Sequence, residues 1–164
     1  MAGRAPRRDP NARPSPPGPA AAPRGVFAVV AGRFHEPVSK RLVDGALHAF
    51  HAAGVEAVAV HWVPGSFELP QAALHLAGTG RYAGIVCVGV VIRGETPHFE
   101  HVAREAAAGI RQVALATGVP TTFGVVTALS EEQAWARAGG EVGNRGEEAA
   151  EAALEMATFI QRLG

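Results

Sequence analysis

The feature that most constrains the fold of this chain is a regular alternation of strand-type and helix-type segments after residue 25. Short apolar runs rich in β-branched residues, typical of buried strands, alternate four times with segments whose apolar residues recur every three or four positions. The sequence between them carries no hairpin signal, so consecutive strands need crossover helices and lie parallel. The pattern predicts a three-layer α/β/α sandwich around a four-stranded parallel sheet, a flavodoxin-like α/β fold. The strands are expected at residues 26–31, 57–63, 84–92 and 121–127.

Helices are expected at residues 37–53, 68–76, 99–114, 131–139 and 146–163. Local signals mark several of their ends. Gly54 follows the first helix as a C-cap, and Ser130 with Gln133 forms a capping box for the fourth helix. Pro70 is compatible with the second helix because it falls in the first turn.

Residues 1–24 differ from the rest in composition. They hold seven prolines and five arginines against one aspartate, a net charge of +4. Such a segment cannot bury a core, so we expect a disordered tail followed by one domain over residues 25–164. That domain has 10 basic and 14 acidic residues, a net charge of −4, which argues against nucleic acid as a partner.

The location of the protein is constrained by what the sequence lacks. No apolar run approaches the roughly 20 residues that a membrane span needs, and the first 24 residues have no apolar core of a secretory signal. The single cysteine, Cys87, lies in the apolar run IVCVGVV, where we expect it to be buried and inert. One cysteine excludes an internal disulfide, so a cytoplasmic location is expected.

Ligands of open α/β sheets bind beyond the carboxyl ends of the strands, so the four loops there are the candidate site. They read GRFHE, PGSFE, RGETPH and ALSEEQ. In the third, Gly94 allows a tight turn, and Glu95 and Thr96 are expected at the start of the longest helix. Free N–H groups there form a phosphate cradle, although Thr96 could equally be an ordinary N-cap. His98 is placed to move protons, or is simply a surface residue.

The other loops carry residues with two interpretations each. Phe34 and Phe67 follow the first two strands and could stack on a flat heteroaromatic ligand, or pack against the body of the protein. Glu68 could accept hydrogen bonds from sugar hydroxyls, or favour its helix N-terminus. Arg137 and Arg145 could bind phosphate or be ordinary surface charges. His98 and His101 lack an evident third ligand, so no metal site is expected.

Taken together, these loops resemble those of the lumazine synthase family. The family's patterns occur in order from about residue 26 onward: PGSFELP, GVVIRGETPHFEHV, PTTFGVVT, EEQAWARAG and GNRGEEAAEAALEMA. The resemblance implies a cofactor-free condensation of 5-amino-6-(D-ribitylamino)uracil with 3,4-dihydroxy-2-butanone 4-phosphate. The products are 6,7-dimethyl-8-ribityllumazine, phosphate and water, the penultimate step of riboflavin biosynthesis.

The resemblance also implies roles for individual residues. The uracil substrate would be bound by Phe34 on its pyrimidine ring, by Ser66, Phe67 and Glu68 on its ribityl chain, and by the backbone of Val91 and Ile92 on its ring edge. The phosphate of the second substrate would be bound by Gly94, Glu95 and Thr96. A neighbouring subunit would contribute Phe123 and Arg137. His98 shuttles protons as the catalytic residue. Three departures from the family stand out: His35 replaces the usual asparagine of the substrate site, Arg145 replaces a lysine there, and Glu141 falls where relatives carry lysine.

A site shared between subunits requires an oligomer. The family forms pentamers, and some members assemble twelve of them into an icosahedral shell. The short RAGGEVGNRG turn resembles the shell-forming type, whereas the proline-rich first segment cannot supply a pairing N-terminal strand. Two alternatives to the active enzyme remain: a non-catalytic member that binds flavin-like ligands or forms a shell, and a different phosphosugar enzyme on the same type of sheet.

Overall fold

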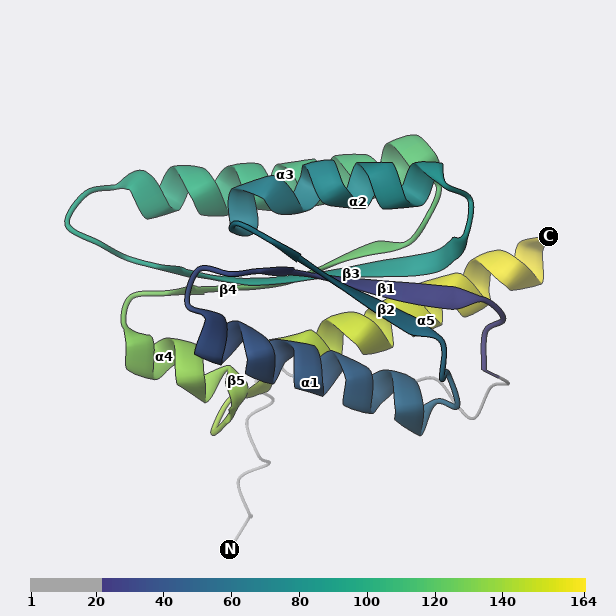
Figure 1. Ribbon diagram of the computed structural model, residues 1–164, viewed down its shortest axis with the longest axis horizontal. Helices are drawn as coiled ribbons and strands as arrows, with labels where there is room; N and C mark the ends of the chain where they lie inside the picture. Colours follow the sequence, from purple (N-terminus) through teal and green to yellow (C-terminus); the bar gives the residue numbers. More distant parts are fainter. Residues whose placement is uncertain (1–21) are drawn as a thin grey trace, which may run out of the picture.

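The structure is a computed structural model that describes residues 22–164. The chain folds around one parallel sheet, which Figure 1 shows edge-on. The strands have the order β2-β1-β3-β4, and every neighbouring pair is parallel. Their bounds are β1 Val26–Gly32, β2 Val58–Val63, β3 Tyr82–Ile92 and β4 Thr121–Ala128. The predicted four-stranded parallel sheet is confirmed. The prediction of a disordered tail lies, for residues 1–21, outside the described residues.

Helices cover both faces of this sheet, as the sequence predicts. In Figure 1, α2 and α3 form one layer, and α1, α4 and α5 form the other. Their bounds are α1 Glu36–Ala52, α2 Leu69–Gly78, α3 His98–Thr117, α4 Glu131–Ala136 and α5 Arg145–Leu163, with a 3-10 turn η1 at Ser66–Glu68. Among the residues that the structure describes, no helix is both long and apolar enough to cross a membrane.

The central strands β1 and β3 are apolar throughout because both of their faces are covered. Alternate side chains of β1 enter opposite cores: Phe27 and Val29 pack with α1 and α5, whereas Ala28 and Val30 pack with α2 and α3. The ring of Phe27 lies 4.9 Å from that of Phe50 of α1, centroid to centroid. Burial on both faces explains why the strands read as continuous apolar runs.

Two predicted helix caps are confirmed. Gly54 has φ 82°, its N–H bonds to the carbonyl of His51, and the next N–H bonds to the carbonyl of Phe50. This is the Schellman arrangement, which glycine favours because it adopts a positive φ without steric cost. At α4, the Ser130 side chain accepts a hydrogen bond from the N–H of Gln133.

Two expectations of the local structure are wrong: the absence of a hairpin and the start of the longest helix. A short antiparallel hairpin exists, formed by β5 Ala138–Gly140 and β6 Gly143–Asn144. Glycines in this segment remove the β-branched signal of a strand, while Gly139 and Gly143 adopt positive φ values that form the turn. The helix expected from about Glu68 is α2, which begins at Leu69 directly after the 3-10 turn η1. The longest helix, α3, begins at His98 rather than at Glu95 and Thr96, and Pro97 is its N-cap.

The strand order creates a natural ligand site. The chain leaves β1 toward α1 on one face of the sheet and leaves the adjacent β3 toward α3 on the other. The two connections diverge at the carboxyl ends of β1 and β3, which opens a crevice between them. Such a switch point is where open α/β sheets bind their ligands.

Candidate functional site

A cavity of about 530 Å³ lies at this switch point. Its volume is in the range of small-molecule sites. Three loops and the first turns of α3 form its walls. The lining residues are Phe34, His35, Gly65, Ser66, Phe67, Glu68, Val90, Val91, Ile92, Gly94, Thr96, His98, Phe99, His101 and Val102. Ten of the fourteen residues singled out from the sequence line this cavity.

Two exposed aromatic rings flank the cavity. The side chain of Phe34, after β1, is 69% exposed, and that of Phe67, in η1, is 60% exposed. Large apolar side chains at this level of exposure in a concave site indicate a surface for a flat ligand. The interpretation that these rings simply pack against the body of the protein is wrong.

Polar groups in the β2–α2 connection face the same space. The hydroxyl of Ser66 is buried and has no hydrogen-bond partner within residues 22–164. Gly89 permits this position, because a Cβ atom there would lie 2.5 Å from Ser66 Oγ. A buried hydroxyl normally has a partner, so Ser66 is available to a ligand in the cavity. Glu68 adds a half-buried carboxylate to the same wall.

The third wall is the loop from β3 to α3. Gly94, Thr96 and His98 line the cavity, and no side chain caps the first turn of α3. The N–H of Glu100 donates to the carbonyl of Pro97, at 3.0 Å, whereas those of His98 and Phe99 have no side-chain cap. Together with the helix dipole, these N–H groups favour an anion. Because Pro97 is the N-cap, the reading of Thr96 as an ordinary cap is wrong.

Five of the lining residues were not predicted from the sequence to bind the ligand. Gly65 precedes Ser66 in the β2–α2 connection, Val90 precedes the expected pair Val91 and Ile92 on β3, and Phe99, His101 and Val102 follow His98 on α3. Positions three and four residues beyond His98 lie on the same face of the helix as His98, and Phe99 and Val102 are likewise three residues apart. The spacing therefore carries the signal, but only once the cavity shows which side faces it.

Four predicted residues do not line the cavity. Glu95 lies between two lining residues of its loop. Phe123 pairs with Cys87 in the middle of the sheet and is 46% exposed on edge strand β4. Arg137 donates to the carbonyl of Gln133 of its own helix, at 3.0 Å.

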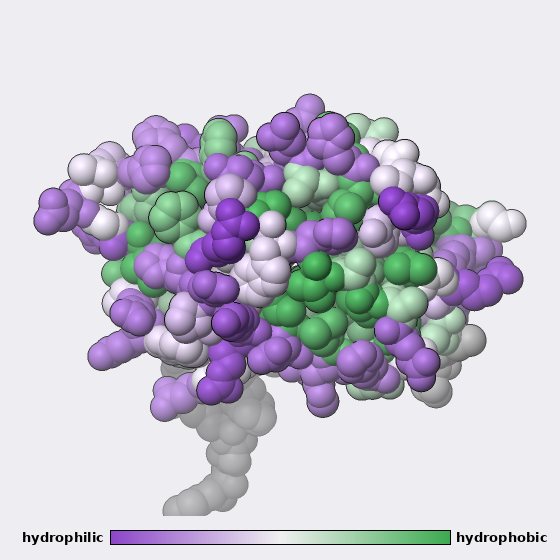
Figure 2. All heavy atoms as spheres, viewed as in Figure 1, coloured by the Kyte–Doolittle hydropathy of each residue, from purple (hydrophilic) through white to green (hydrophobic). Residues whose placement is uncertain are grey.

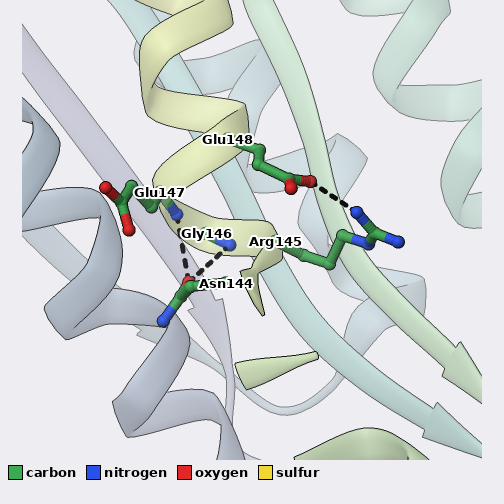
Figure 3. A network of polar contacts seen from close by, with 5 residues as sticks. All are labelled: Asn144, Arg145, Gly146, Glu147 and Glu148. Carbon is green, nitrogen blue, oxygen red and sulfur yellow. Dashed lines mark hydrogen bonds and ion pairs between the residues drawn. The ribbon is translucent and has the colours of Figure 1, made fainter. Parts of the chain in front are cut away.

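The fourth of these residues, Arg145, does not line the cavity and forms a local ion pair. Its guanidinium lies 2.6 Å from the Glu148 carboxylate, as Figure 3 shows. The neighbouring Asn144 points the other way and caps α5 by accepting from the N–H groups of Gly146 and Glu147.

Cys87 is buried in the sheet, as the sequence predicts, and does not line the cavity. Burial raises the pKa of its thiol to about 12, so the thiol is protonated at neutral pH. Within the described part of the chain, no three His, Cys, Asp or Glu side chains come together in a way that could hold a metal ion.

The fold and the cavity define a class: α/β proteins with a cavity at the switch point of a parallel sheet, lined here by aromatic rings and by the start of a helix that no side chain caps. Residues 25–161 match the family model of 6,7-dimethyl-8-ribityllumazine synthase, and the chain belongs to this family.

A relative of known family gives the same assignment. The chain is 50% identical over 139 residues to the 6,7-dimethyl-8-ribityllumazine synthase of Salinibacter ruber, a match that covers 84% of this chain and 89% of that relative. A crystal structure of a sigma-54 interaction domain protein from Enterococcus faecalis is 15% identical with a TM-score of 0.31, covering 88% of this chain and 98% of that one. At that score nothing about fold or function follows from it.

Proposed function

We propose that this protein condenses 5-amino-6-(D-ribitylamino)uracil with 3,4-dihydroxy-2-butanone 4-phosphate to give 6,7-dimethyl-8-ribityllumazine, phosphate and water. The reaction is the one named in the description of the family to which the chain belongs. The observation that carries the proposal is a single cavity that joins exposed rings, an unpartnered hydroxyl, a carboxylate and an uncapped helix N-terminus. Those groups match a flat heteroaromatic ring, a polyol chain and a phosphate.

The ribitylaminouracil occupies the part of the cavity formed by the β1 and β2 loops. Its ring stacks on Phe34, and the backbone of Val91 and Ile92 reads the ring edge. Its hydroxyl groups bind Ser66 and Glu68 beside Phe67. Stacking and hydroxyl recognition are supported by the exposure of the Phe34 ring and by the unpartnered Ser66 hydroxyl.

The butanone phosphate occupies the other part of the cavity, at the start of α3. Gly94, Glu95 and Thr96 surround the phosphate, which the free N–H groups of the helix terminus bind. His98 is the first residue of that helix and lines the cavity. It is therefore close to both substrates and is the group that we assign to proton transfer.

The chemistry needs no group other than these residues. The 5-amino nitrogen attacks the ketone carbon, and water leaves as the imine forms. Removal of the proton on C3 of the sugar chain then expels phosphate from C4, and the C–O bond electrons depart with the phosphate oxygen. The resulting enol tautomerises to a ketone at C3 with a methyl group at C4. The ribitylamino nitrogen finally attacks this new carbonyl carbon, and a second water leaves. His98 takes and returns the protons that these steps move, and the anion site stabilises the departing phosphate.

A second copy of the chain completes the site. The cavity lining contains no lysine or arginine, and Phe123, Arg137 and Arg145 lie outside it. We assign Phe123 and Arg137 to the cavity of the neighbouring subunit, where Arg137 balances the phosphate charge. The departures at His35 and Arg145 alter single polar contacts, and Arg145 reaches a phosphate only after leaving Glu148.

The surface supports this assembly. Figure 2 shows hydrophobic atoms gathered on one face, over the region where Figure 1 has β2 between α1 and α2. There β2 is an edge strand with half-buried apolar side chains, a surface that a second chain can cover. We propose a homopentamer as the unit, with the icosahedral shell as its higher assembly, in the cytoplasm.

Turnover is the first test. Purified protein is mixed with both substrates, and lumazine absorbance and fluorescence are followed against an enzyme-free control, since the substrates also react spontaneously. Acceleration supports the enzyme. Binding of lumazine without acceleration supports the alternative, a non-catalytic member of the family, which the change at His35 favours.

A complementation experiment tests the shared site. His98→Ala and Arg137→Ala chains are co-expressed and compared with each variant alone. If Arg137 acts in the neighbour's cavity, mixed oligomers contain some sites with both wild-type residues and exceed the average of the two variants. Activity equal to that average would place both residues in one subunit. Analytical ultracentrifugation of the same samples gives the assembly size.

A further inference from the structure

The Phe34 ring is fixed by backbone geometry rather than by packing. Its side chain is 69% exposed, so few neighbours hold it. Its own N–H donates to the carbonyl of Pro64 at 3.2 Å, and its carbonyl accepts from the buried Ser39 hydroxyl at 3.4 Å. The Phe34 peptide thus joins the β1 loop to the β2 loop on one side and to α1 on the other.

The next residue sets the direction of the chain. His35 has φ 55° and ψ 48°, and it is the single residue other than glycine with a positive φ in the described range. In this conformation its carbonyl accepts from the N–H groups of Val38 and Ser39, both at 3.0 Å, and so starts α1. Asparagine and histidine tolerate this conformation better than most residues, which explains the asparagine of the family pattern.

The ring then lies on a glycine of the opposite loop. A Cβ atom on Gly65 would be 2.7 Å from Cδ2 and 3.3 Å from Cε2 of Phe34, and 3.4 Å from Oε2 of Glu68. Gly32 and Gly65 also meet closely, since a Cβ atom on Gly32 would lie 3.1 Å from the Gly65 carbonyl carbon. The ring therefore occupies the space that a side chain at position 65 would fill.

The backbone of Gly65 does not itself require glycine. Its φ is −161° and its ψ is −172°, an extended conformation that alanine adopts freely. The atoms that an added methyl group would meet belong to the Phe34 and Glu68 side chains, which can move without shifting the main chain. What glycine provides at this position is room for the ring, and substitution by alanine moves the ring instead of unfolding the loop.

We propose that Gly65 is a positioning residue for the aromatic substrate: it holds the Phe34 ring in the place that receives the ribitylaminouracil. The inference rests on the proposed function insofar as Phe34 is the stacking surface. It adds a residue that touches neither substrate through a side chain yet determines affinity for one of them.

The test is a double-mutant cycle between Gly65→Ala and Phe34→Ala. Binding of 6,7-dimethyl-8-ribityllumazine is titrated by fluorescence, and KM is measured for each substrate. Gly65→Ala should weaken lumazine binding and raise the uracil KM about tenfold, the upper end of what one aromatic contact contributes. The butanone phosphate KM should stay within about twofold. In the Phe34→Ala background, Gly65→Ala should have almost no further effect.

The matched control is Gly78→Ala, because a Cβ atom at that helix end meets nothing within 4 Å. Circular dichroism and sedimentation establish that each variant folds and assembles. An equal loss from Gly65→Ala with and without Phe34, or an equal rise in both KM values, overturns the proposal. Failure of the proposed function is separate: it appears in the wild-type protein, as absence of lumazine binding and of turnover.

Discussion

Gly146, at the start of α5, should not tolerate a methyl group. A Cβ atom there would overlap the carbonyl oxygen of Leu42 in α1 and lie 2.7 Å from its carbonyl carbon and 2.9 Å from its Cα. The neighbouring Asn144 fixes the same crossing, since its side-chain amide donates to the Arg41 carbonyl at 2.9 Å while its oxygen caps α5 (Figure 3). The two helices therefore meet backbone to backbone.

The cost of Gly146→Ala follows from this geometry. Overpacking costs about 1–3 kcal/mol, and the upper end applies because no rotamer change relieves a clash with main-chain atoms. Alanine in place of glycine returns up to about 1 kcal/mol of helix stability. The net loss should be about 2 kcal/mol, which lowers Tm by roughly 4–8 °C in a chain of this size.

Thermal and chemical unfolding measure this loss, with all samples at one protein concentration because oligomer stability depends on it. Gly78→Ala is the control: it has open space, so its stability should equal or slightly exceed that of the wild type. If Gly146→Ala unfolds together with Gly78→Ala, the helices can separate freely, and the argument for a rigid α1–α5 crossing is refuted.

Four further substitutions test the site and its supports. His98→Ala should lower turnover by no more than about 100-fold, since general acid–base help starts at that size and the uracil amine is already nucleophilic; an unchanged rate removes His98 from the mechanism. Arg137→Ala should raise the KM of the butanone phosphate far more than that of the uracil; equal rises make Arg137 structural. His35→Val should destabilise the protein by about 1–2 kcal/mol in denaturant unfolding, whereas His35→Asn should not, because a branched side chain resists a positive φ. Between pH 9 and 12 the native state keeps the Cys87 proton that the unfolded chain releases, so the free energy of unfolding falls by up to about 1.4 kcal/mol per pH unit. Cys87→Ala should remove this contribution to the pH dependence of the free energy of unfolding, and an unchanged pH dependence contradicts deep burial of the thiol.

The main elements were predictable because their signals are local and repeated. Strands buried on both faces are apolar throughout, and Gly54 and Ser130 mark helix ends by their own chemistry. The hairpin over residues 138–144 escaped prediction since its strands consist mainly of glycine and alanine, which carry no strand propensity. The start of α3 was misplaced because Pro97, which supplies no capping side chain, is its N-cap.

The candidate site was predictable to the extent that one chain forms it. Parallel topology brings the carboxyl ends of β1, β2 and β3 together, so residues directly after those strands converge whatever their separation in sequence. Phe34, Ser66 and His98 meet this condition. His101 lines the cavity because of the way α3 packs on the sheet. Local sequence does not determine which side of that helix faces the cavity.

The residues left outside the cavity have a different explanation from those that were misplaced. Phe123 and Arg137 do not follow any of the three strands whose ends form the cavity, and no rearrangement of loops moves a mid-strand residue such as Phe123 to the carboxyl end of its sheet. Either the family pattern does not apply at these positions or a second subunit supplies them. The lining has no lysine or arginine to balance a phosphate dianion, which favours the second choice. Assembly is then a condition for binding the phosphate substrate, and a variant that remains monomeric should lose affinity for butanone phosphate while Phe34 still stacks on the ring of the uracil.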